Sequence, residues 1–130
     1  MDSTEKVSVN MNIGTLSQID LLVDLGYYSN RSDFINQSVR QVLEQKRSII
    51  EGETQRHLSY NEDWFIGVYV FTEAQLRHAQ EAGKRIKVKG YGLAVIDKSL
   101  DELALDTIEE INVKGKVICS ERVKTGLGLK

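Results

Sequence analysis

The sequence predicts an α+β protein in two parts: a strand followed by helices, then a β-rich region with at least one helix of its own. Residues 6–12 alternate strictly between polar and apolar side chains, the pattern of a strand with one buried face. Helical spacing of apolar residues follows for about forty residues. The next strongly apolar segment, residues 64–71, is β-prone and predicts a buried strand.

The first strand reads Lys-Val-Ser-Val-Asn-Met-Asn from Lys6 to Asn12. Its apolar face carries Val7, Val9 and Met11, and its polar face presents Lys6, Ser8 and Asn10. A single strand needs a partner for its hydrogen bonds and a cover for its apolar face, yet no second strand follows nearby. We therefore expect it to pair with the same strand of a second copy, in an intertwined homodimer. A two-stranded ribbon of this kind fits the major groove of DNA.

Two helices are predicted after the strand. Thr15 to Gln18 match a capping box, so the first helix is expected over Leu16–Leu25 and is closed by Gly26. Asn30 begins the second helix, which is expected to stop near Gly52, with continuation to residue 57 left open. A segment of about fifty residues rarely folds alone, which also favours a dimer.

This order of elements resembles the ribbon-helix-helix DNA-binding regulators of the MetJ/Arc/CopG type. The segment Gly26–Arg40, Gly-Tyr-Tyr-Ser-Asn-Arg-Ser-Asp-Phe-Ile-Asn-Gln-Ser-Val-Arg, is similar to the N-terminal part of regulators with an added C-terminal domain, including nickel-responsive ones. The likeness covers roughly residues 5–47. It implies that Lys6, Ser8 and Asn10 read base edges in the major groove, and that Asn30, Arg31 and Ser32 hold a phosphate. Many members present an arginine on the strand, whereas this ribbon offers only Lys6 as a cation.

The sequence is expected to divide into three parts. Residues 1–50 form the ribbon-helix-helix domain, and residues 51–63 form a polar linker or an extension of the second helix. Residues 64–130 form a β-rich C-terminal domain that binds an effector or mediates oligomerisation.

The C-terminal domain has its own pattern. After the strand at 64–71, a capping box at Thr72–Gln75 predicts a helix to Ala82. The pattern Ile-x-Val-Lys-Gly occurs at 86–90 and 111–115, and each copy precedes a further apolar strand, at 93–96 and 117–119. The two copies suit either two rungs of a solenoid-like repeat or an ordinary β-rich sheet. Residues 100–108 suit a helix or a series of turns.

No metal site, cofactor or catalytic group is predicted. The histidine cluster of nickel-responsive regulators is missing: His57 is expected in the linker, His78 on a helix surface, and Cys119 in the core. The carboxylates at 101–110 are spaced as on a solvated face. We therefore expect a protein that is not an enzyme.

Charge and composition limit the ways in which the chain could bind DNA. The net charge is −2, and residues 1–50 carry five basic and six acidic side chains. DNA affinity must then come from a few placed contacts and not from bulk charge. The single cysteine favours a reducing interior, and no membrane segment or signal peptide is found, so a cytoplasmic protein is expected.

Together these features predict a sequence-specific DNA-binding transcriptional regulator, expected to act as a repressor. Its partners are double-stranded DNA and a second copy, in a homodimer or a dimer of dimers, with an unidentified small-molecule effector as a further candidate. One alternative is an antitoxin-type autorepressor. The other is a structural or oligomerisation protein in which the ribbon is only a dimer clasp.

Overall fold

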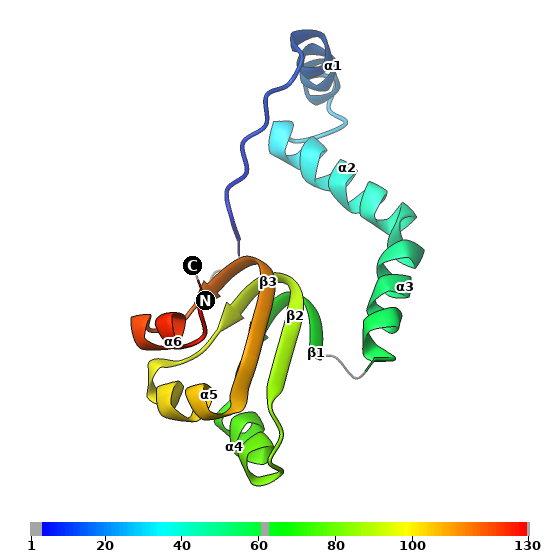
Figure 1. Ribbon diagram of the computed structural model, residues 1–130. Helices are drawn as coiled ribbons and strands as arrows, with labels where there is room; N and C mark the ends of the chain where they lie inside the picture. Colours follow the sequence, from blue (N-terminus) through cyan, green and yellow to red (C-terminus); the bar gives the residue numbers. More distant parts are fainter. Residues whose placement is uncertain (1–3, 61–62, 130) are drawn as a thin grey trace. The chain divides into compact units, whose positions relative to one another are not determined.

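The computed structural model describes residues 4–60 and 63–129, and its helices and three-stranded sheet confirm the α+β class (Figure 1). The chain folds as two compact units, Met1–Glu51 and Gly52–Lys130. The boundary falls inside the helix α3 (Arg47–Leu58).

The first unit contains α1 (Ile13–Asp24) and α2 (Arg31–Gln45). The prediction that Thr15 caps α1 is wrong, because Asn12 is the cap: its side chain accepts hydrogen bonds from the backbone N–H groups of Gly14 (2.8 Å) and Thr15 (3.3 Å). Asparagine is the stronger N-cap residue, and it starts the helix three residues earlier. At the other end Gly26 has a φ of 87°, the conformation expected of a closing glycine.

Residues 4–12 precede α1 and form neither a helix nor a strand in the single chain. The side chains of Val7 and Val9 are 79% and 74% exposed. The pairing expected for this segment requires a second chain, so the ribbon itself remains a prediction.

The second helical segment is two helices and not one. Lys46 lies between α2 and α3 with φ −99° and ψ 7°, and α3 then passes through Gly52 to Leu58. Glycine inside a helix costs about 1 kcal/mol relative to alanine but does not end it. Residues 51–58 are therefore a helix, and residues 61–62 of the expected linker lie outside the described part.

The second unit is built on three parallel strands in the order β1-β2-β3, spanning Asp63–Val70, Ile86–Val95 and Ile108–Ile118. Helix α4 (Glu73–Glu81) follows β1, η1 (Lys98–Leu100) and α5 (Asp101–Thr107) follow β2, and α6 (Glu121–Gly126) follows β3. Residues 101–107, whose structure was left open, are thus a helix. The strands expected separately at 86–90 and 93–96 form one continuous strand, β2, which ends at Val95. The segments expected at 111–115 and 117–119 are likewise continuous in β3, which ends at Ile118.

The core of this unit lies on one side of the sheet. Leu76 of α4, Ala104 of α5 and Val123 of α6 are fully buried with Val88 and Ile108 of the strands. The expectation that residues 64–71 form a buried strand is wrong for most of β1. Ile66, Val68 and Val70 are exposed, because α4, α5 and α6 pack on the opposite face of the sheet.

A row of glycines bends the sheet. Gly67, Gly92 and Gly115 are in register on the three strands and have φ values of 115°, 129° and 142°. These positive φ values depart from the regular strand conformation at the same level of all three strands, a feature called the glycine corner below. The strands are visibly curved in Figure 1. If the two Ile-x-Val-Lys-Gly copies were equivalent in the sheet, Gly90 would pair with Gly115. Gly90 instead pairs with Val113, so the two copies are not equivalent.

Candidate nucleic-acid interface

The candidate base-reading residues lie on the unpaired N-terminal segment. Lys6, Ser8 and Asn10 are exposed and alternate with the exposed Val7 and Val9. Side chains on alternate positions of an extended chain point to opposite sides. Pairing with a second chain would therefore turn both valines inward and leave the three polar side chains outward.

The candidate phosphate site lies at the start of α2. Asn30 caps this helix as predicted, because its Oδ1 accepts the N–H of Asp33 at 2.8 Å. Asp33 in turn accepts the N–H of Ser29 through Oδ2 at 2.9 Å. These two bonds fix the turn that precedes the helix. The first N–H groups of any helix lack a carbonyl acceptor within it, which makes such an end suitable for an anion.

Arg31 is held by an ion pair that the sequence did not indicate. Its Nε and one terminal nitrogen donate to the two carboxylate oxygens of Asp20 at 2.8 and 2.9 Å. The hydrogen bond from Arg31 lowers the pKa of Asp20 below its ordinary value. The pair connects α1 with α2, so a phosphate at Arg31 would have to share the guanidinium with a carboxylate.

Asp33 places a second carboxylate at this helix end. Hydrogen bonds from the Gln37 side chain and from the Ser29 backbone lower its pKa below the ordinary value. Asp33 is therefore negative at neutral pH and competes with an incoming phosphate for the end of the helix. Ser32, between Arg31 and Asp33, stays a candidate phosphate donor.

The first unit has almost no interior of its own. Ile19 is the one buried apolar side chain among residues 4–51, and Tyr28 contacts Phe34 edge to face at a centroid distance of 4.9 Å. Many large apolar side chains of α1 and α2 remain exposed, among them Leu21, Leu25, Ile35, Val39, Val42 and Leu43. Exposed apolar surfaces of this kind are typical of sites where proteins contact one another.

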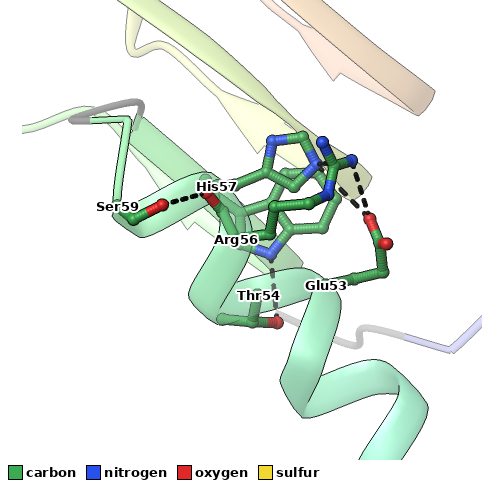
Figure 2. A network of polar contacts seen from close by, with 6 residues as sticks. Glu53, Thr54, Arg56, His57 and Ser59 are labelled. Atoms are coloured by element: carbon green, nitrogen blue, oxygen red, sulfur yellow. Dashed lines mark hydrogen bonds and ion pairs between the residues drawn. The ribbon is translucent and has the colours of Figure 1, made fainter.

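Within the second unit, the end of α3 contacts β1 through a group of aromatic and polar side chains, which Figure 2 shows close up. His57 was expected in a linker, but it is buried and stacks on Trp64 of β1 at a ring-centroid distance of 4.0 Å. The Trp64 indole donates to Thr54 Oγ1 at 3.2 Å, and Arg56 donates to Glu53 at 2.9 Å. Stacking and hydrogen bonding give this cluster an anchoring role. The aromatic Trp64 and the apolar run that follows were visible in the sequence, but their contact with α3 was not.

The remaining candidate groups form no chemical centre. His78 is an exposed residue of α4, as expected, and Cys119 is partly buried beside the core, where burial raises the pKa of its thiol. Within residues 4–60 and 63–129, no three His, Cys, Asp or Glu side chains gather as metal ligands would. The same residues include no helix long and apolar enough to span a membrane.

Comparison with known protein families gives a match. The model of the Ribbon-Helix-Helix transcriptional regulator family matches residues 2–124 and thus extends through both units into α6. No curated protein and no solved structure gives a significant match.

Proposed function

Since this chain belongs to the Ribbon-Helix-Helix transcriptional regulator family, we propose that it represses transcription as a homodimer whose paired N-terminal segments enter the major groove of specific DNA sites. The observation that carries the proposal is the exposed alternation of residues 6–12. Its apolar side chains lack a cover, and its polar side chains are those that read base edges.

The dimer follows from the exposed apolar surface of the first unit. Burying one Val side chain stabilises a structure by about 1.5–3 kcal/mol. Each chain of the dimer would bury two of them, Val7 and Val9. Antiparallel pairing of the two segments also satisfies their backbone hydrogen bonds. The exposed faces of α1 and α2 would complete the shared core.

Base reading is assigned to Lys6, Ser8 and Asn10 from both chains. Lysine donates to O6 and N7 of guanine, and asparagine pairs with N6 and N7 of adenine. Serine can donate or accept, so Ser8 suits several bases. The start of α2 at Asn30, Arg31 and Ser32 would position the ribbon by contact with the phosphate backbone, which carries no sequence information.

The proposal is tested by measuring binding to DNA from upstream of the protein's own gene, with scrambled duplex as the reference. Lys6→Ala and Asn10→Ala should each weaken specific binding by about 1–3 kcal/mol, because each removes a base contact in both chains. Affinity should fall linearly with salt on logarithmic axes. Light scattering on the same samples should show an unchanged dimer.

Lys46→Ala is the matched control, since it removes an exposed lysine at the C-terminal cap of α2, away from the ribbon. It should leave the preference for the upstream fragment intact. Wild-type affinity of both ribbon variants, with the dimer intact, would favour the alternative in which the ribbon is only a clasp.

A further inference from the structure

The two edges of the sheet in the second unit differ in chemistry. β1 and β3 are the edge strands, and each pairs with β2 on one side only. β3 carries Glu109, Glu110, Lys114 and Lys116, whereas β1 has no charged residue after Asp63. Charged side chains protect an exposed edge from pairing with other chains, and an uncharged apolar edge invites it. Only the β3 edge is protected in this way.

The glycine corner restricts how β1 can pair with a second copy. A two-fold axis reverses the strand, so the corner of one copy meets that of the other only if Gly67 lies opposite Gly67 of the second copy. Ile66 then lies opposite Val68 of the second copy, Trp64 opposite Val70, and Phe65 opposite Tyr69. Every one of these pairs is apolar or aromatic, the types that stabilise neighbouring strands.

The same operation on β3 gives the opposite result. If Gly115 lay opposite Gly115 of the second copy, Lys114 would face Lys116 of the second copy. By symmetry, Lys116 would also face Lys114 of the second copy. Like charges directly opposite each other destabilise paired strands. The charge pattern thus selects β1 and not β3 as the edge that pairs with itself.

The described contact between α3 and β1 lies on the outer face of the sheet, where His57 stacks on Trp64. A Cβ atom on Gly92 would lie 2.0 Å from the carbonyl oxygen of Gly67, and one on Gly115 would lie 2.0 Å from that of Gly92. A Cβ on Gly67 would have no neighbour within 4 Å. The place where a fourth strand would approach Gly67, as Gly67 approaches Gly92, is therefore empty.

We propose that the second units of two chains pair through β1, antiparallel about Gly67, to form one continuous six-stranded sheet. This deepens the role of the C-terminal unit in the function proposed above. The pairing depends only on the second unit. The number of chains in the assembly also rests on the proposed N-terminal dimer, because a chain with two pairing surfaces can join dimers into tetramers.

The register is tested by disulfide trapping in full-length chains that carry Cys119→Ser. One chain carries Ile66→Cys and a co-expressed chain carries Val68→Cys, both at exposed positions. Directly opposite residues bring their Cβ atoms to about 4.5–5.5 Å, close to the distance a disulfide needs. Mild oxidation should give a cross-linked dimer as the main mixed product, and neither variant alone should cross-link efficiently.

The matched control is Lys114→Cys co-expressed with Lys116→Cys, the corresponding positions on β3. It should not cross-link, because that edge is not used. Equal cross-linking of the control, or none for the β1 pair, would overturn the proposal. DNA binding is measured separately, so a failure of β1 pairing is distinguishable from a failure of the proposed function.

Discussion

Two asparagines determine where the helices of the first unit begin. The role of Asn30 could be predicted, because a capping residue with an acid three positions later is a local signal. Asn12 was missed, because the nearby Thr15–Gln18 pattern is also a valid capping box and sequence alone does not rank the two. The Arg31–Asp20 pair was missed because its partners are eleven positions apart and meet only after α1 and α2 pack.

The ion pair between Arg31 and Asp20 should make stability depend on pH. The pKa of Asp20 is lowered in the folded chain, so the pair stabilises the fold above the ordinary carboxyl pKa and loses this effect as pH falls through the lowered value. Asp20→Asn should therefore reduce the free energy of unfolding at neutral pH, and the difference from wild type should disappear in acid. Urea unfolding at a series of pH values measures this difference.

Arg31→Gln supplies the control background. In that background Asp20→Asn should have little further effect, as expected for two residues that act as a pair. A pH-dependent loss that persists without Arg31 would assign the effect to another partner of Asp20.

At the scale of single elements, β1 and the glycine row show why sequence patterns mislead. The run at 64–71 resembles a strand buried on both sides, yet its outer side chains are exposed, because an uncovered apolar face has the same sequence pattern as a covered one. Residues 86–90 and 93–96 were expected to form separate strands with Gly90 and Gly92 at or near the break. Both lie inside β2, and their alignment with other strands depends on a register that sequence alone does not reveal.

The corner predicts contrasting effects for two glycine substitutions. Gly92→Ala places a Cβ atom 2.0 Å from the Gly67 carbonyl oxygen at a φ of 129°, so it should reduce the free energy of unfolding by at least about 3 kcal/mol. Gly52→Ala, in the exposed interior of α3 with no atom within 4 Å, should instead stabilise by about 0.5–1 kcal/mol. Denaturant unfolding of both variants measures these effects, and a mild effect of Gly92→Ala would contradict the tight strand approach.

The end of α3 gives a second contrast, between the two histidines. His57→Ala removes a buried ring stacked on Trp64 and should cost about 2–3 kcal/mol of stability, whereas exposed His78→Ala should have almost no effect. His57→Phe keeps an aromatic ring and should restore part of the loss. Thermal unfolding followed by Trp64 fluorescence is a suitable measurement. Equal effects of the two alanine variants would argue against an anchoring role for the stack.

Over the whole molecule, the two units differ in what they need in order to fold. The second unit has a core of twelve buried apolar side chains, whereas the described part of the first unit buries only Ile19. The resemblance of residues 5–47 already indicated the family, and the family match to residues 2–124 confirms it. The parallel order of β1, β2 and β3 was not predicted, because it depends on contacts between segments far apart in the sequence.

Val9→Asp tests how far the first unit depends on a partner. Val9 is 74% exposed in the single chain, so the substitution should affect the dimer far more than the monomer. Light scattering at low protein concentration should show loss of the dimer formed by the first unit, with the helices of the second unit retained in circular dichroism. Lys6→Ala, on the opposite face of the same segment, is the control. A Val9→Asp protein with unchanged N-terminal association would remove the main support for the ribbon.

The caps at Asn12 and Asn30 also have a kinetic consequence. Each closes a helix end through partners no more than three residues away, so α1 and α2 can begin to form before any second chain arrives. The proposed ribbon, by contrast, would form only by collision of two chains. Refolding should therefore show a fast phase that is independent of concentration and a slower phase whose half-time shortens as protein concentration rises. Newly made chains would be most vulnerable to proteolysis while they wait for a partner, so synthesis rate itself would influence how much regulator survives.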